Sequence, residues 1–279
     1  MNKETKTIPY PLGARTSPNQ ATEIKVGSVV IGQSTFTVIA GPCAVESKGQ
    51  LKSVAEAVHE AGAKILRGGA YKPRTSPYSF QGLEEEGLKY LREISQALNM
   101  PVVSEIMDAR QITAMLGSID IFQVGARNMQ NFTLLKELGL IRKPVLLKRG
   151  MGSKLEELLG AAEYILKGGN KEVILCERGI RTFEDMTRAT LDISAVPILK
   201  KLTHLPVIVD PSHAAGQSDI VPALALAACT AGADGILVEV HDNPAKALCD
   251  GKQALSPEDF SKLMTKLKEM TQVAGKKFN

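Results

Sequence analysis

Short apolar segments rich in β-branched residues alternate with helical patterns along most of this 279-residue chain. Eight of these segments predict strands, at residues 37–41, 63–67, 101–105, 119–124, 144–148, 172–176, 206–210 and 235–240. Runs such as VIVD and ILVEV are apolar throughout, which is typical of parallel strands buried on both faces. Alternating strands and helices favour a parallel sheet, and eight units favour its closure into a (β/α)8 TIM barrel.

Helix-start and helix-stop signals fall between the predicted strands. Ser47 opens a capping-box pattern before an apolar stripe, and Gly62 follows that stripe as a stop. Ser153 repeats the start signal for a second helix. The last helix is predicted to begin at Ser256, because the proline that follows it suits the first helical position.

The segment before the first predicted barrel strand has a different character. Residues 1 to about 23 are polar and contain proline, so we expect an arm or a loose extension. The next segment, IKVGSVVIGQSTFTVIAG, alternates around a Gly-Gln-Ser break and predicts a small β-hairpin. We therefore divide the chain into an N-terminal arm and hairpin, residues 1–36, and a catalytic barrel, residues 37–279.

Composition argues against several classes of protein. No apolar run approaches the roughly 20 residues of a membrane helix, and the N-terminus lacks the apolar core of a signal peptide. We therefore expect no membrane association and a cytoplasmic location. The net charge of +4 comes with no long basic tract, which argues against nucleic-acid binding. Four cysteines without a CxxC pair do not form a disulfide framework in a chain of this size.

Candidate metal ligands follow strands that become neighbours once the barrel closes. Cys43 follows the first strand, His213 follows the seventh, Glu239 ends the eighth, and Asp250 lies in the next loop. A thiolate, an imidazole and two carboxylates suit one divalent ion, with Mn, Fe, Co and Zn all acceptable. Each residue alone has an ordinary explanation, such as an inert buried thiol at Cys43. Their combination on adjacent strands favours a metal site.

A group of cations lies at the same predicted rim of the barrel. They follow or end the second, fourth, fifth and sixth strands: Arg67, Lys72, Arg127, Lys148 and Arg178. Pairing with a nearby carboxylate would explain any one of them, but five together favour a bound polyanion. The polar loop KPRTSPYSFQG adds Arg74, Thr75 and Ser76, which suit a second phosphate. The alternative for this loop is a proline-shaped lid that makes no contacts.

Seven motifs together resemble one family. They are AGPCAVES, KILRGGAYKPRTSPYSFQG, QVGARN, LLKRG, CERG, DPSHAAGQ and VEVH. They are similar to the 3-deoxy-D-arabino-heptulosonate 7-phosphate (DAHP) synthase family, in its shorter type Iβ branch, and the resemblance covers residues 24–273. It implies a (β/α)8 transferase that condenses phosphoenolpyruvate with erythrose 4-phosphate, the first step of the shikimate pathway to chorismate and aromatic amino acids.

The resemblance also implies a role for each residue. The metal ligands would be Cys43, His213, Glu239 and Asp250. Phosphoenolpyruvate would be held by Arg67, Lys72, Gly125, Ala126, Arg127, Lys148 and Arg178. Erythrose 4-phosphate would be held by Lys72, Pro73, Arg74, Thr75, Ser76 and Asp250. Catalytic roles would fall to Lys72, Glu105 and His213.

The implied reaction uses one divalent metal ion and no organic cofactor. The ion polarises the aldehyde oxygen of erythrose 4-phosphate, and C3 of phosphoenolpyruvate attacks the aldehyde carbon. Water then adds at C2, helped by Glu105 or a neighbour, and the resulting hemiketal phosphate collapses. The cations fix phosphoenolpyruvate and offset its charge.

Two other functions compete with this interpretation. The first is the sister 3-deoxy-D-manno-octulosonate 8-phosphate (KDO8P) synthase, which uses arabinose 5-phosphate and typically carries KANRSS. This chain has KPRTS from Lys72 to Ser76, which favours the four-carbon sugar. The second is a barrel kept as a non-catalytic regulatory partner, which the loss of a ligand or cation would support. No such loss is seen at the motif positions.

The resemblance further implies a homo-oligomer, either a tetramer or a dimer. Some relatives work with chorismate mutase, so such a partner is compatible with catalysis here. About 36 residues precede the first barrel strand, which is too few for a fused regulatory domain. We therefore expect no feedback by aromatic amino acids, or feedback that acts through a separate protein.

Overall fold

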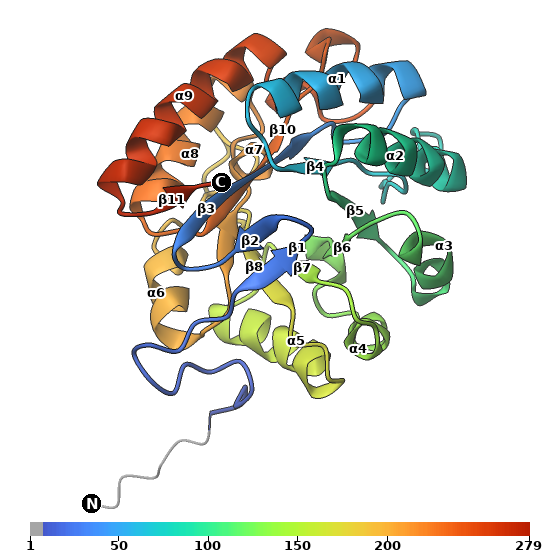
Figure 1. The fold of residues 1–279 in the computed structure, drawn as a ribbon. Coiled ribbons are helices and arrows are strands. Elements are labelled where there is room, and N and C mark those ends of the chain that lie inside the picture. The colour runs from blue at the N-terminus through green and yellow to red at the C-terminus, as the bar shows by residue number, and fades with distance from the viewer. Residues whose placement is uncertain (1–7) are drawn as a thin grey trace, which may run out of the picture.

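A ring of eight parallel strands organises the computed structural model, which describes residues 8–279 (Figure 1). In order around the ring the strands are β3 (Thr35–Gly41), β4 (Ile65–Arg67), β5 (Val102–Ile106), β6 (Ile121–Val124), β7 (Val145–Lys148), β8 (Val173–Glu177), β9 (Val207–Val209) and β10 (Gly235–Glu239). β10 pairs with β3 in parallel, with Gly235 opposite Thr37, and this pairing closes the barrel. The predicted (β/α)8 fold is confirmed, and each predicted strand matches within two residues at either end.

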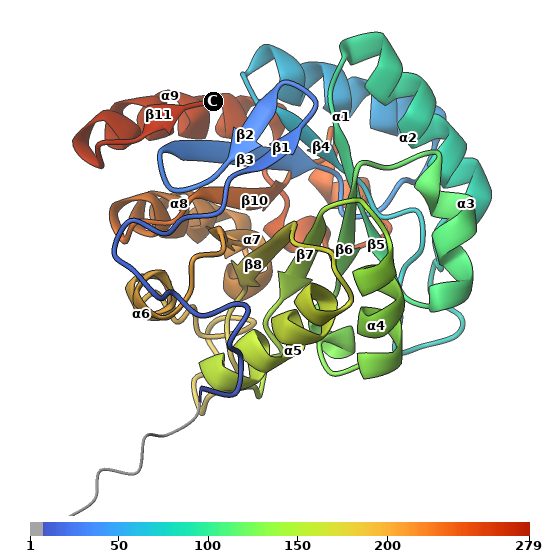
Figure 2. The same cartoon turned by 60° about the horizontal axis from the view of Figure 1, so that its bottom comes forward.

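Helices cover the outside of the ring (Figures 1 and 2). The α-helices are α1 (Lys48–Glu60), α2 (Glu84–Leu98), α3 (Ile112–Leu116), α4 (Phe132–Leu140), α5 (Leu155–Lys167), α6 (Ala195–Leu202), α7 (Pro211–Ala215), α8 (Val221–Thr230) and α9 (Pro257–Val273). Short 3-10 turns add η1 (Ala109–Gln111), η2 (Ala126–Asn128), η3 (Ser218–Ile220), η4 (Pro244–Lys246) and η5 (Gly251–Gln253). The main apolar core lies between this helical layer and the strands.

Two of the three predicted helix starts are confirmed, and one is wrong. Ser47 and Ser256 each accept a backbone N–H three residues later, as N-caps do. Ser153 does not cap α5, which begins one residue further on, after Lys154. The backbone of Ser153 is already used in a turn: its N–H donates to Gly150, and its carbonyl accepts a hydrogen bond from Arg149.

The N-terminal end of the barrel is closed by an apolar plug. Strands β1 (Ile24–Val26) and β2 (Val29–Ile31) form the predicted hairpin, which lies across the centre of the ring in Figure 1. Its buried side chains pack on the residues that fill the barrel interior: Ile39, Ile65, Val103, Ile121, Leu146, Ile174, Cys176, Ile208 and Leu237. The interior is therefore a packed core, and an open cavity is left only for the opposite end of the strands.

The arm, residues 8–23, is fixed to the barrel rather than loose. The N–H groups of Leu12 and Gly13 donate to the Glu163 carboxylate on α5, at 2.9 and 3.0 Å. Thr22 Oγ1 lies 2.7 Å from His204 Nδ1 beyond α6. Residues 1–7, which the same prediction covered, lie outside the described part of the chain. A short strand that was not predicted, β11 (Lys277–Phe278), pairs with the start of β3.

None of the helices within residues 8–279 is long and apolar enough to cross a membrane.

Candidate active site

A cavity of about 210 Å³ opens at the C-terminal ends of the strands, opposite the hairpin plug. Its wall is made by Lys72, Pro73, Arg74, Thr75, Glu105, Gly125, Ala126, Arg127, Lys148, Met151, Arg178, Arg188, His213 and Asp250. Twelve of these fourteen residues were among the sequence-based candidates, and Met151 and Arg188 were not. Three further candidates, Cys43, Arg67 and Glu239, are buried and do not form the wall. Ser76 also lies outside it.

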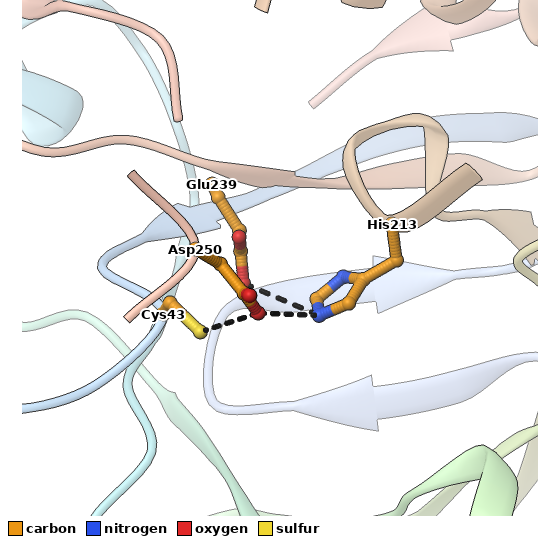
Figure 3. Close-up of side chains that lie close together, drawn as sticks. All are labelled: Cys43, His213, Glu239 and Asp250. Carbon is orange, nitrogen blue, oxygen red and sulfur yellow. Dashed lines mark hydrogen bonds and ion pairs between the residues drawn. The ribbon is translucent and has the colours of Figure 1, made fainter. Parts of the chain in front are cut away.

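The four predicted metal ligands meet beside this cavity (Figure 3). Cys43 follows β3, His213 lies in α7, Glu239 is the last residue of β10, and Asp250 precedes η5. One ligand atom from each residue lies within 4.8 Å of the others. His213 Nε2 is 3.4 Å from Glu239 Oε1 and 3.9 Å from Asp250 Oδ2, and Cys43 Sγ is 3.3 Å from Asp250 Oδ2. This spacing leaves room for one ion among the four atoms.

The protonation states of this group also suit a metal. Burial lowers the pKa of His213, although Asp210 and Glu239 act in the opposite direction, so the imidazole is neutral at neutral pH and free to coordinate. Burial alone would raise the pKa of Glu239, but the charge of His213 when it is protonated in acid, and the charges of Arg67 and Lys72, hold it well below its ordinary range.

The thiol of Cys43 behaves differently from the other ligands. Contact with Cys249, burial and the charge of Glu239 raise the pKa of Cys43 well above its ordinary value. The metal-free site therefore holds a protonated thiol. A bound divalent ion would displace that proton, because the thiolate is the form that coordinates metals.

Asp210 orients His213, and the sequence analysis did not single it out as a site residue. Its Oδ1 accepts the His213 backbone N–H at 2.9 Å. Its Oδ2 lies 2.7 Å from His213 Nδ1, but off the line of a hydrogen bond. A carboxylate behind an imidazole ligand selects the ring tautomer that frees the other nitrogen for a metal. The signal was present, because Asp210 directly follows a buried strand, much as Glu239 ends one.

The five predicted cations divide into two groups. Arg67 and Lys148 each pair with a buried carboxylate at 2.5 Å, on Glu239 and Asp210 respectively. Pairing, the ordinary explanation, therefore accounts for these two. Within residues 8–279 the other three, Lys72, Arg127 and Arg178, have no carboxylate within 4.0 Å.

The contacts of these three cations are with neutral groups or solvent. Lys72 Nζ donates to the Cys43 carbonyl at 3.1 Å and lies 3.0 Å from its sulfur. Arg178 Nη2 donates to the His213 carbonyl at 3.0 Å, and burial lowers the pKa of Arg178. Arg127 is exposed at the rim. A buried cation without an acidic partner is costly, so Lys72 and Arg178 favour an anionic ligand, and Arg127 adds an exposed charge at the same rim.

Gly125 and Glu105 are closely packed across the cavity from the metal ligands. A Cβ atom at Gly125 would lie 2.1 Å from Glu105 Oε1, so no other residue fits at this position without moving the carboxylate. Glu105 Oε2 accepts a hydrogen bond from Gln123 at 3.3 Å. The glycine in the QVGARN motif therefore lets a carboxylate lie directly against the backbone that carries Arg127.

Only some of the residues predicted to bind a second phosphate, in the polar loop after β4, line the cavity. Arg74 contacts the thiol of Cys249, and Thr75 lines the wall. Ser76 Oγ instead accepts the N–H of Tyr78 at 3.3 Å, within the loop itself. Of the three residues suggested for a second phosphate, two therefore border the cavity.

The comparisons with known proteins agree on one family. The model of the DAHP synthetase I family matches residues 13–275. The chain is 53% identical over 271 residues to phospho-2-dehydro-3-deoxyheptonate aldolase of Thermotoga maritima, covering 97% of this chain and 80% of that protein. A crystal structure of a Thermotoga maritima DAHP synthase superposes with a TM-score of 0.94 at 53% identity, covering 97% of this chain and 79% of that one.

A more distant similarity concerns the sister activity. The chain is 32% identical over 265 residues to 2-dehydro-3-deoxyphosphooctonate aldolase of Geobacter sulfurreducens, covering 88% of this chain and 96% of that protein.

Proposed function

Because this chain belongs to the DAHP synthetase I family, we propose that its barrel mouth condenses phosphoenolpyruvate with erythrose 4-phosphate. The products are DAHP and phosphate, and the reaction opens the shikimate pathway. The observation that carries the assignment of the site is that a metal-ligand set and cations without carboxylate partners meet at one cavity. The more distant similarity to the octulosonate enzyme supports the same barrel but a less related activity.

Cys43, His213, Glu239 and Asp250 would hold one divalent metal ion. The donor set fits such an ion, because it combines a thiol, a neutral imidazole and two carboxylates within 4.8 Å. Mn, Fe, Co and Zn all suit these donors. When bound, the ion would supply Lewis-acid polarisation of the aldehyde oxygen of erythrose 4-phosphate.

Phosphoenolpyruvate binds on the cation side of the cavity. Arg127 and Arg178 have the free donors for its phosphate and carboxylate, and Lys148 and the backbone at Gly125 and Ala126 border the same space. Arg67 is buried behind the cavity wall and pairs with Glu239, but its Nε has no hydrogen-bond partner within residues 8–279. A bound carboxylate or phosphate would satisfy that donor.

Lys72 and Glu105 perform the proton chemistry. The pKa of Lys72 is raised overall: burial lowers it, but the negative charge of Cys43 once its thiol is ionised and the charge of Glu105 more than offset that, so the ammonium stays charged next to the metal ligands. It is therefore suited to donate to the aldehyde oxygen as negative charge develops there. Glu105 faces the cavity from β5 and takes the proton of the water that adds at C2.

Arg74 and Thr75 bind the phosphate of erythrose 4-phosphate at the outer part of the cavity, with Pro73 shaping the loop. Asp250 and Lys72 face the sugar from the metal side. Ser76 lies outside the wall, so its contact with the phosphate requires the loop to move inward when the sugar binds.

The test is phosphoenolpyruvate consumption by metal-loaded protein with either erythrose 4-phosphate or arabinose 5-phosphate, each repeated after chelation. We expect turnover only with erythrose 4-phosphate, and we expect chelation to abolish it. Turnover mainly with arabinose 5-phosphate would support the octulosonate synthase instead. No turnover with either sugar in folded, metal-loaded protein would support the regulatory-partner alternative.

A homo-oligomer is also part of the proposal. Phe132 and Tyr164 stack on the outer surface of α4 and α5 with ring centroids 4.6 Å apart, and Leu140 is 65% exposed on the same helix as Phe132. Such a group of exposed apolar side chains supports self-association. Sedimentation velocity over a range of concentrations would detect a dimer or tetramer. The chorismate mutase partner and the cytoplasmic location stay predictions.

A further inference from the structure

Each of the two carboxylate ligands directs one oxygen to the centre and the other away from it. Glu239 Oε1 is the oxygen that lies 3.4 Å from His213 Nε2, and it also accepts a hydrogen bond from Arg67 Nη1 at 2.5 Å. Asp250 Oδ2 is the oxygen that lies 3.3 Å from Cys43 Sγ. Figure 3 shows the two carboxylates meeting the imidazole and the thiol in this way. The outward oxygens, Glu239 Oε2 and Asp250 Oδ1, are therefore free to be held by other residues.

Two residues that the reaction itself does not use hold these outward oxygens. Gln253 Nε2 donates to Glu239 Oε2 at 2.7 Å. Arg188 Nη1 lies 3.2 Å from Asp250 Oδ1 and donates to Gln253 Oε1 at 2.7 Å. The amide of Gln253 can point only one way, because the guanidinium only donates and the carboxylate only accepts. Arg188 thus reaches Asp250 directly and Glu239 through Gln253.

We propose that Arg188 and Gln253, the outer pair, are positioning residues of the metal centre. The proposal rests on the metal site described under the proposed function. By holding the outward oxygens, the outer pair keeps the inward oxygens facing the ion, which is the role of residues behind metal ligands in general. Gln253 is 2% exposed, so its amide cannot exchange these partners for water.

Asp250 needs such support more than the other ligands do. Its backbone is left-handed, at φ 51° and ψ 28°, which costs energy in a residue that is not glycine. Its carboxylate is only partly buried, and besides Arg188 it lies near the charge of Lys72. The Arg188 bond fixes which oxygen faces inward, and without it the carboxylate could rotate toward Lys72.

Arg188 also connects the ligands to the segment that follows Arg178. The N–H groups of Arg188 and Ala189 donate to the carbonyls of Ala215 and Ala214, at 3.2 and 2.9 Å, at the end of the helix that carries His213. The packing is tight, since a Cβ atom at Gly216 would lie 2.5 Å from Arg188 Cβ. The same short segment therefore contacts Asp250 directly, and it reaches Glu239 through Gln253 and His213 through the helix that carries it.

The test measures the dissociation constant of Mn²⁺ by competition with a chelator, in the absence of substrate. Arg188→Met and Gln253→Met should each weaken Mn²⁺ binding roughly 10–100-fold, the usual effect of losing a residue behind a metal ligand. Arg188→Lys should fall between wild type and Arg188→Met, since lysine can reach only one of the two oxygens at a time. The double variant should lose less than the product of the two single losses, because Arg188 acts on Glu239 through Gln253.

Arg181→Met is the matched control. Arg181 is exposed in the same segment and forms no ion pair within residues 8–279, so this variant removes the same charge without touching a ligand. We expect wild-type Mn²⁺ affinity for it. The absorption spectrum of bound Co²⁺ should change in Arg188→Met and stay unchanged in the control, because it reports ligand geometry rather than folding.

Unchanged Mn²⁺ affinity and an unchanged Co²⁺ spectrum in folded Arg188→Met and Gln253→Met would contradict the positioning role of the outer pair. Equal losses in the Arg181→Met control would also overturn it, because a general charge effect would then suffice. Cys43→Ala separates this outcome from failure of the proposed function. If wild type binds Mn²⁺ and Cys43→Ala does not, the metal site stands and only the outer pair is in question. If wild type binds no metal, both proposals fail.

Discussion

The two ends of this barrel treat buried charge in opposite ways. At the N-terminal end Asp234 is fully buried, and Lys200, Lys276 and the Val207 N–H bind its carboxylate at 2.7, 2.7 and 2.8 Å. At the C-terminal end Lys72 and Arg178 are buried without any carboxylate within 4.0 Å in the described part of the chain. A buried charge that has its partners stabilises the fold. A buried charge without a partner destabilises the ligand-free protein, and an anionic ligand can remove that penalty.

The same contrast holds for apolar packing. The β1–β2 hairpin fills the N-terminal end with aliphatic side chains, and the opposite end opens into the polar cavity. Both ends belong to the same eight strands, so the difference comes from the residues at the strand ends rather than from the architecture. In barrel enzymes, residues at the N-terminal face commonly contribute to stability, and residues at the C-terminal face carry out the chemistry.

Removing a metal ligand should have the largest effect and should be confined to the C-terminal end. We expect Cys43→Ala to lose metal binding and to lower kcat by more than about 1,000-fold, because Lewis-acid stabilisation is worth several kcal/mol. The measurement is metal content by elemental analysis together with turnover. An active variant with a full complement of metal would contradict the ligand assignment.

Removing the paired carboxylate at the N-terminal end should damage stability instead. Asp234→Ala leaves the partly buried Lys200 and Lys276 without their partner, which should lower the free energy of unfolding by about 3–5 kcal/mol. Denaturant unfolding measures this loss. The KM for phosphoenolpyruvate of the folded variant should stay at the wild-type value, and a raised KM would break the contrast between the two ends.

Removing an unpaired cation from the C-terminal end should weaken substrate binding and leave stability unchanged. Arg178→Met should raise the KM for phosphoenolpyruvate roughly 10–100-fold, the value of one or two charged hydrogen bonds. It should not lower the stability of the ligand-free protein, because the hydrogen bonds of Arg178 within residues 8–279 go to backbone carbonyls alone. A large loss of stability with an unchanged KM would show that Arg178 is structural.

The smallest effect concerns pH and the metal. Because the pKa of Cys43 is raised, its thiol keeps its proton between pH 7 and 9, and binding a metal releases that proton. Metal affinity should therefore increase with pH over this range, by at most about tenfold per unit. The pKa of His213 is lowered, so the imidazole is already neutral and adds nothing to the slope. A flat profile would exclude Cys43 as the thiol that loses the proton.

The fold and the clustering of the four candidate ligands were predictable because both depend on local signals. A buried strand that ends in a charged residue is visible in the sequence, and closing eight such strands into a ring brings Cys43, His213 and Glu239 together without further information. The same rule would have found Asp210. The start of α5 was missed because the turn that occupies Ser153 depends on Arg149, whose position the sequence does not give.

The partners of each charge could not be predicted, because they depend on contacts between distant segments. The motif LLKRG contains two cations, yet Lys148 faces Asp210 in the cavity while Arg149 pairs with Glu177 and Asp192 outside it. No sequence pattern indicated a role for Arg188 or Gln253. They lie 65 residues apart, and their hydrogen bond forms only when the loops that carry them pack together.

A crystal structure with Mn²⁺ and phosphoenolpyruvate would test most directly whether metal and substrate bind at the C-terminal end of the barrel, opposite the β1–β2 hairpin. The anomalous signal of manganese would locate the ion. We expect one ion bound by Cys43, His213, Glu239 and Asp250, with the outward carboxylate oxygens on Gln253 and Arg188. We also expect phosphoenolpyruvate against Arg127 and Arg178. An ion held by other residues, or phosphoenolpyruvate bound away from these cations, would contradict this expectation.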